Sequence, residues 1–247
     1  SFKIVNLSSG QGAGGTAASG VSFVNDAATF DIMPAVARYE IKKVSAGTTT
    51  TEVDQPLSGF KLTGIFITNT YNKLGLDYAT LPSATADIIK VGPVSASFET
   101  DIPARLQDVM APASNATSFI PTEGAGYFWH YFLAAPIAGK GTTLDGNTQA
   151  ESSVPMIVLR IEDAASTNTG PGAPTYAQTS YINVRKLVKT VGGAEVTHLE
   201  PGSVYIIDDI MFGGEHLTPD PGQNHEKAVT VKVTVKPWSG VSVKPEL

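Results

Sequence analysis

The chain has 247 residues, of which 42% are hydrophobic and 16% are charged, so it can build a large core and is not intrinsically disordered. Its formal net charge is −6 without any basic cluster, which argues against nucleic acid as the partner. Cysteine is absent, which excludes disulfides, thiolate metal sites and cysteine nucleophiles. No apolar run approaches the roughly 18 residues of a membrane-spanning helix.

Strand-like segments follow one another along the chain. Apolar and polar residues alternate over residues 37–44, and a run rich in aromatic and β-branched residues follows at 60–70. Further strands are predicted within 88–98, 127–134, 154–162, 180–188 and 204–212. Residues 105–110 are predicted as a single helical turn and residues 115–126 as a loop. With roughly nine to eleven strands and many Gly and Pro residues, the pattern predicts an all-β sandwich.

The C-terminal stretch carries the clearest pattern. Four valines, from Val229 to Val235, alternate with Thr and Lys, which is typical of a strand with one buried face. Pro237, Trp238, Ser239 and Gly240 interrupt the alternation, and residues 241–247 then resume it on the same odd-numbered positions. This second apolar strand either closes its own sheet or completes the sheet of another molecule.

A glycine-rich stretch matches the dinucleotide-binding pattern at Gly10, Gly12 and Gly15. That pattern binds phosphate only where it opens a helix whose N-terminal amides face the anion. Here the chain returns within a few residues to glycine and another strand-like run. We interpret the stretch as a loop, and no cofactor is expected.

One histidine-rich loop is a weak candidate for a metal site. His216, Asp220, His225 and Glu226 lie within eleven residues, and imidazole and carboxylate groups bind transition metals or Ca²⁺. Their spacing matches no helix face, and prolines stiffen the loop. A solvated turn is therefore the default interpretation, and no metal is predicted.

No arrangement of residues indicates catalysis. The Asp208–Asp209 pair is interpreted as a strand end or bulge and not as an acid/base pair, and His130 as a core histidine. There is no Gly-x-Ser-x-Gly motif, and no serine has a histidine and an acid at a recognisable spacing. The chain is not expected to be an enzyme, although a hydrolase or metal-dependent enzyme on a β-sandwich is the third hypothesis, since a fold alone does not exclude activity.

Several segments together resemble a known family. They are MPAVARYEIKKV, FKLTGIFITNTYNKL, GYFWHYFLAAP, SSVPMIVLRIE, HLEPGSVYIIDDIMFGG and the close EKAVTVKVTVKPWSGVSVKPEL. In this order they are similar to the fimbrillins of Bacteroidales, the type V pilin subunits of major and minor fimbriae. The resemblance covers residues 27–247 and is strongest at the two ends of that range.

The resemblance implies a transthyretin-like, Greek-key β-sandwich that is mostly antiparallel. Residues 1–33 would be the closing strands of a truncated N-terminal domain or a leading segment, and residues 34–247 the C-terminal domain. Fimbrillins are exported across the outer membrane as lipoprotein precursors and assemble on the cell surface. An arginine-specific protease removes an N-terminal strand, and a strand from a neighbouring subunit fills the groove that opens.

By this resemblance the polymerisation strand is the C-terminal segment, with Pro237 and Trp238 as hinge and plug. Its residues are Ser239, Gly240, Val241, Ser242, Val243, Lys244, Pro245, Glu246 and Leu247. The implied partners are other copies of the chain or related fimbrial subunits. The alternative function is a tip or accessory adhesin that binds a host or bacterial surface protein or glycan, with the aromatic residues of 127–132 as sugar-stacking faces.

Overall fold

The computed structural model describes residues 36–68, 70–71, 88–89, 106–121, 128–133, 154–219, 221 and 227–237. The described residues do not include residues 1–33, which contain the glycine-rich stretch, or the predicted polymerisation strand at 239–247. Trp238, Asp220 and His225 also lie outside them. Within the described residues the regular structure is β, apart from one 3₁₀ turn, η2 (Gly214–His216). Among these residues there is no helix with the length and apolar character needed to cross a membrane.

The strands of the described residues form three sheets. They are β1 (Ala37–Ile41), β2 (Val44–Ala46), β3 (Leu57–Thr68), β4 (Thr70–Tyr71), β5 (Ile88–Ile89), β6 (Leu106–Val109), β7 (Ser118–Phe119), β8 (Trp129–Leu133), β9 (Met156–Ser166), β10 (Thr179–Lys189), β11 (Ser203–Ile207), β12 (Ile210–Phe212) and β13 (Val229–Pro237). The large sheet has eight strands in the order β6-β3-β9-β10-β13-β11-β1-β8, and the small sheets have the orders β12-β2-β7 and β4-β5. In the large sheet β10–β13 and β1–β11 are parallel, and the other neighbours are antiparallel. The predicted all-β, mostly antiparallel fold is confirmed.

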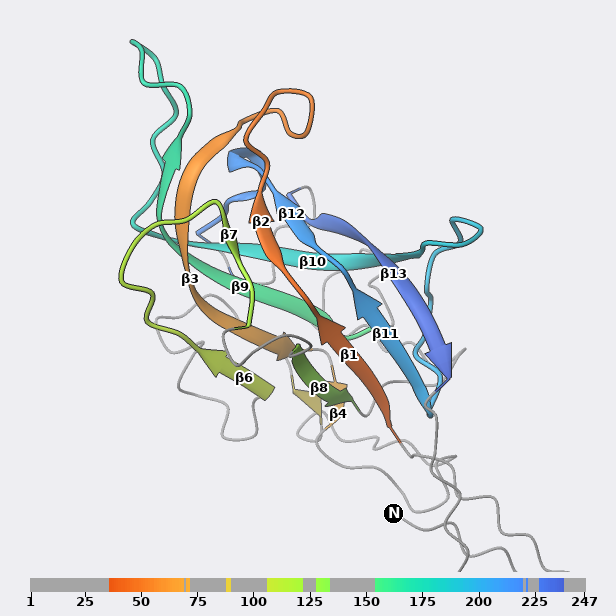
Figure 1. Cartoon of the computed structure of the whole chain (residues 1–247). Coiled ribbons are helices and arrows are strands. Elements are labelled where there is room, and N and C mark those ends of the chain that lie inside the picture. Colours follow the sequence, from red (N-terminus) through yellow and green to blue (C-terminus); the bar gives the residue numbers. More distant parts are fainter. Residues whose placement is uncertain are drawn as a thin grey trace, which may run out of the picture.

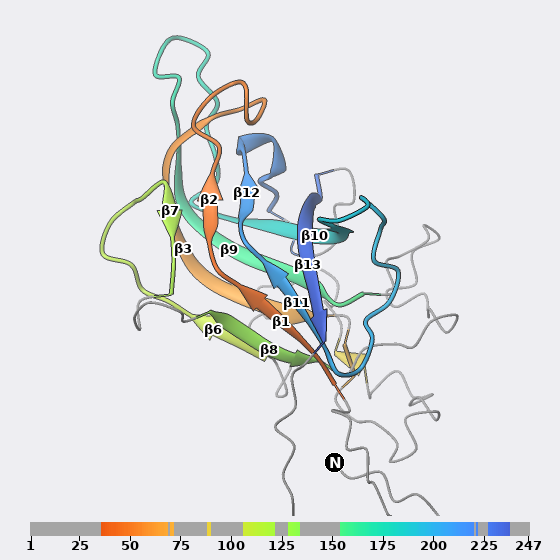
Figure 2. The ribbon, with the colours of Figure 1, turned by 45° about the vertical axis from the view of Figure 1, so that its right-hand side comes forward.

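The large sheet curls until it is nearly closed (Figures 1 and 2). Its edge strands β6 and β8 meet at one hydrogen bond, in which the Tyr131 hydroxyl donates to Asp108 Oδ2 at 2.5 Å. The core lies between β3, β9 and β10 on one side and β1, β11 and β13 on the other. Tyr39 of β1 crosses this core, because its hydroxyl donates to the carbonyl of Pro155, just before β9, at 3.0 Å. The two layers are thus joined by a buried polar contact as well as by apolar packing.

Two parallel strands leave the large sheet side by side. The chain passes from β1 to β2 through Lys42 and Lys43, and from β11 to β12 through Asp208 and Asp209. Lys42 pairs with Asp208 and Lys43 with Asp209, each with an N–O distance of 2.5 Å. The two aspartates therefore mark a strand end, as the sequence indicates, and they balance the lysines where both strands enter the small sheet. Because three of these four side chains are substantially exposed, each pair contributes only about 0–1 kcal/mol.

Three predictions of local structure are wrong. Residues 106–109 form the strand β6 instead of a helical turn, because they pair with the edge of β3. The predicted loop at 115–126 contains the strand β7, which pairs with β2. His130 is exposed and not a core histidine, because alternation along the edge strand β8 places Tyr131 and Leu133 inside and His130 outside.

Gly64 is needed where β3 bends. A Cβ at this position would lie 2.6 Å from Cε2 of Phe66, whose ring packs with Met156 and Val158 in a second, smaller apolar cluster. We expect Gly64→Ala to destabilise the fold by about 1–3 kcal/mol, because the ring must move out of this packing. Gly170→Ala is the control, since the only neighbour near its Cβ is a side-chain oxygen of the exposed Asn168 at 3.4 Å. Urea denaturation of both variants measures the difference, and equal midpoints would contradict the expectation.

Candidate strand-exchange site

The strand that precedes the predicted polymerisation strand is held firmly in the large sheet. β13 lies between β10 and β11 and pairs with both. Val229, Val231 and Val233 are buried, while Thr230 and Lys232 are exposed, so the predicted alternation is confirmed. A strand with neighbours on both sides is not available for exchange. A strand donated from the C-terminal part of the chain would therefore have to begin after β13.

β13 ends at the rim of the sheet. Pro237 is its last residue, is exposed, and lies opposite Ser203 at the start of β11. On the other side of β11 the carbonyl of Val36 accepts a hydrogen bond from the Gly202 N–H at 3.0 Å. Residues 36 and 237 thus lie at the same end of the large sheet, on either side of β11 (Figure 1). The hinge role of Pro237 and Trp238 stays a prediction, as does the role of residues 239–247.

One segment closes the side of the sandwich between β3 and β2. Residues 107–121, which we call the cover segment, begin on β3 as β6 and end on β2 as β7. Between these strands Ala116 and Phe60 exchange two backbone hydrogen bonds of 3.0 Å. No residue of the cover segment is buried, and Val109 and Ile120 are 64% and 63% exposed. Sequence reasoning missed this segment because it shows no apolar alternation.

Phe60 is the buried residue that joins β3 to the cover segment and to the small sheet. Its ring meets Phe119 of β7 edge to face, with centroids 5.1 Å apart, and Phe212 of β12 at 4.9 Å. Phe60 and Phe212 are fully buried, whereas Phe119 is only half-buried. The core therefore extends to the cover segment, whose half-buried Met110 and Phe119 pack against it.

The hydrogen bond between Tyr131 and Asp108 ties the cover segment to β8. Burial raises the pKa of Tyr131 above the usual tyrosine value. The hydrogen bond to Asp108 and the negative charge of the Asp108 carboxylate raise it further. The hydroxyl therefore remains a donor at neutral and mildly alkaline pH. Asp108 lies opposite Ile65, so its carboxylate stands on the core-facing side of β6.

Removing this hydroxyl should loosen the cover segment. We expect Tyr131→Phe to speed amide hydrogen exchange in residues 107–110 by roughly tenfold, because a hydrogen bond to a carboxylate contributes about 1.5–3 kcal/mol. Exchange in β9 should not change. Tyr176→Phe is the control, since its hydroxyl makes a longer contact of 3.4 Å to Gln55, far from β6. Unchanged exchange in residues 107–110 would show that the bond does not hold the segment.

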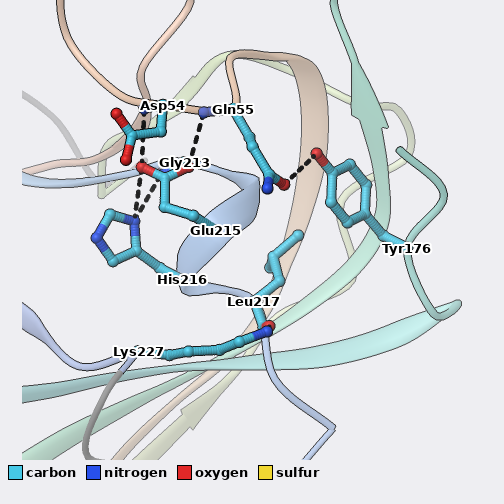
Figure 3. Close-up of polar contacts among 8 residues, drawn as sticks. All are labelled: Asp54, Gln55, Tyr176, Gly213, Glu215, His216, Leu217 and Lys227. Atoms are coloured by element: carbon cyan, nitrogen blue, oxygen red, sulfur yellow. Dashed lines mark hydrogen bonds and ion pairs between the residues drawn. The ribbon is translucent and has the colours of Figure 1, made fainter. Parts of the chain in front are cut away.

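Of the candidate metal ligands, His216 is described, whereas Asp220 and His225 are not. His216 has a structural role (Figure 3). Its Nδ1 accepts a hydrogen bond from the Gly213 N–H at 3.0 Å. The neighbouring Glu215 carboxylate accepts from the backbone N–H groups of Asp54 and Gln55 at 3.1 and 2.9 Å. These bonds fix η2 against the loop between β2 and β3. The described part of the chain brings no three metal-ligating side chains together.

The aromatic residues of 127–132 do not form a row of exposed rings in the described part of this segment. Tyr131 is buried, and Phe128 and Trp129 are half-buried. Phe132 is 46% exposed, its ring meets His130 at a centroid distance of 5.7 Å, and the Arg38 guanidinium carbon lies 6.0 Å from its centroid. A single outward ring offers at most one stacking face.

Comparisons with known proteins show similarity in fold. No family model and no curated protein sequence matches the chain. Among solved structures it is similar to a "putative cell adhesion protein" from Parabacteroides distasonis, with 13% identity and a TM-score of 0.50, over 84% of this chain and 60% of that one. A fimbrilin from Porphyromonas gingivalis gives 11% identity and a TM-score of 0.46, over 86% of this chain and 60% of that one.

The chain spans 60% of the length of each of these proteins. At such identities the likeness concerns the fold and does not by itself transfer an activity, a partner or a location. The chain thus shares its fold with the Parabacteroides protein.

Proposed function

We propose that the chain is a structural subunit of a bacterial cell-surface fimbria. Its residues 239–247 complete the sheet of a neighbouring subunit, and repetition of this contact builds an open filament. The observation that carries the proposal is the end of β13. This central strand reaches an exposed residue, Pro237, opposite the start of β11, and the sequence beyond it repeats the apolar alternation of β13.

Apolar burial and new main-chain hydrogen bonds would hold the joint together. Val241, Val243 and Leu247 would each contribute about 1.5–3 kcal/mol on full burial, or roughly 5–8 kcal/mol together. Main-chain hydrogen bonds to a new neighbour add about 1 kcal/mol each. Ordering a free segment opposes binding by about 1–2 kcal/mol per residue, which for nine residues is comparable to the whole of this gain. A subunit joined in this way is held by slow dissociation as much as by equilibrium affinity.

The proposed role is mechanical linkage without catalysis, in support of cell adhesion. The similar Parabacteroides structure is described as a cell adhesion protein, which favours a surface location. The partners are other copies of the chain or related fimbrial subunits. The precursor is exported across the outer membrane as a lipoprotein, and residues 34–247 form its C-terminal domain.

The alternative is a tip or accessory adhesin of the same fold. The exposed Phe132, with His130 and Arg38 beside it, is the described feature that favours this role. An adhesin of this kind would bind a glycan or a protein surface through these side chains. A glycan array with the wild-type chain and Phe132→Ala tests the sugar-binding form, and an array without signal would exclude it.

Charge substitutions on one face of the C-terminal segment test the main proposal. The double variant Val241→Asp and Val243→Asp places carboxylates where apolar side chains would enter the neighbour, so it should not assemble. Ser242→Asp changes the opposite face and should assemble as the wild type does. Light scattering and negative-stain electron microscopy measure assembly. If the double variant forms filaments at the wild-type rate, residues 239–247 are not the linking strand.

A further inference from the structure

The outer side of β10 and β13 is basic. The buried apolar side chains of both strands point into the core, so alternation places three lysines together on the opposite side: Lys186, Lys232 and Lys236. These two strands contain no acidic residue. Lys186 pairs with Glu195 at 2.9 Å, whereas Lys232 and Lys236 are exposed and have no acidic partner among the described residues. We call this surface the basic face.

The parallel pairing of β10 with β13 creates the basic face. Lys186 lies opposite Thr230, and Lys232 lies opposite Val188. Because the two strands are far apart in the sequence, the chain shows no basic cluster until it folds. On a chain with a formal net charge of −6, a surface on which lysines outnumber acidic residues attracts an acidic partner.

An acidic surface lies at one end of the same molecule. Three loops meet there, at residues 47–56, 167–178 and 213–219 (Figures 1 and 2). Gln55 joins them, because its carbonyl accepts a hydrogen bond from the Gly214 N–H at 2.8 Å and its side-chain oxygen accepts one from the Tyr176 hydroxyl at 3.4 Å. We call this surface the acidic loop end.

The acidic loop end carries negative charge and no basic side chain of its own. Its sequence contains Glu52, Asp54 and Glu215 but no Lys or Arg. The Glu52 carboxylate accepts hydrogen bonds from the backbone N–H groups of Thr48 and Thr49 at 2.8 and 3.2 Å, which lower its pKa and keep it charged. Asp54 is exposed.

We propose that the acidic loop end of one copy docks on the basic face of another copy. This inference rests on the proposed function, which brings copies together, and adds a contact that uses no residue of 239–247. Among the described residues the lysines of the basic face pair with no acid of these loops, so one copy leaves both surfaces available to others. Because the two surfaces differ, the contact is heterologous and repeats from copy to copy.

The contact acts mainly on the rate and the orientation of encounter. Complementary charged surfaces speed association and suppress wrong orientations, and salt screens them within a Debye length of about 10 Å at 0.1 M. An acidic polysaccharide would fit the basic face by the same charges, but it would leave the acidic loop end without a role. A second copy uses both surfaces.

Charge reversal on each surface, separately and together, tests the contact in the full-length chain. The face variant is Lys232→Glu with Lys236→Glu, and the loop variant is Asp54→Lys with Thr50→Lys and Thr169→Lys, all at exposed positions. At low salt we expect each variant to assemble roughly tenfold more slowly than the wild type, measured by light scattering. The combined variant should recover the wild-type rate, because its surfaces are complementary again. Thermal unfolding checks that every variant is folded.

The loop variant also separates the contact from an effect of net charge. Its three substitutions raise the formal net charge from −6 to −2, since Asp54→Lys adds two charges and each threonine substitution adds one. Weaker repulsion between copies would then speed assembly, whereas loss of the contact slows it. The combined variant has the wild-type net charge, because the face variant removes the same four charges.

Cross-linking shows the contact directly. A zero-length carbodiimide joins amines to carboxylates that touch, and an equal mixture of isotopically light and heavy wild-type chains marks links between copies. We expect mass spectrometry to find such links from Lys232 or Lys236 to Glu52 or Asp54. They should be lost at about 0.5 M salt, where screening leaves little of the attraction.

The outcomes separate this inference from the proposed function. Wild-type rates in all variants, without links between the two surfaces, would overturn the contact and leave strand linkage intact. Slow assembly of the face variant beside a wild-type rate in the loop variant would also overturn it, because the basic face would then act without the loops. A wild-type chain that does not assemble would contradict the proposed function, while links between the two surfaces would still support the contact.

Discussion

Deleting residues 239–247 should abolish self-assembly and leave a folded subunit. β13, which precedes the deletion, keeps both of its neighbours, and its buried valines remain in the core. The shortened chain should therefore unfold within a few degrees of the wild-type temperature. Size-exclusion chromatography and electron microscopy measure assembly, and circular dichroism measures unfolding.

A mixing experiment extends this test. The shortened chain keeps its acceptor, so it should cap growing filaments and shorten them in proportion to its share of the mixture. Filaments of normal length from the shortened chain alone would contradict the role of the segment. A cooperative loss of the fold on deletion would show instead that residues 239–247 belong to the subunit's own sheet.

Phe60→Ala should cost about 3–5 kcal/mol of unfolding free energy, the largest effect expected from one side chain here. The ring is fully buried and contacts Phe212 of the small sheet and Phe119 of the cover segment. Its removal leaves a cavity where β3, β2 and β7 meet. For a chain of this size such a loss lowers the unfolding temperature by roughly 10 °C.

Phe132→Ala is the matched control for Phe60→Ala. Both remove one phenylalanine ring from a strand, but Phe132 is 46% exposed on the outer side of β8. Its substitution should cost less than about 1 kcal/mol, since exposed positions contribute little. Chemical denaturation of both variants gives the comparison. Equal losses would show that Phe60 does not join the sheets as described.

The strands with strong alternation could be predicted from the sequence. β3, β9, β10 and β13 fall within or around their predicted segments, because burial on one or both faces leaves a clear apolar pattern. β6 and β7 were not found. They are short edge strands in which no side chain of described burial is fully buried, so their sequences carry no clear apolar alternation, and they form by pairing with β3 and β2.

The candidate site could be predicted only in part. The alternation of β13 and its end near Pro237 follow directly from the order of residues. The contact between the edge strands β6 and β8 could not be predicted, because Asp108 and Tyr131 lie 23 positions apart and meet only when the large sheet curls. His130 was misjudged for the same reason, since an aromatic neighbourhood in sequence does not tell an edge strand from a central one.

Electron cryomicroscopy of assembled filaments tests the central claim most directly, through the path of residues 239–247. The account predicts that this segment leaves its own subunit after Pro237 and pairs within the sheet of the next one. A segment that pairs within its own sheet, in filaments joined by some other surface, would contradict it.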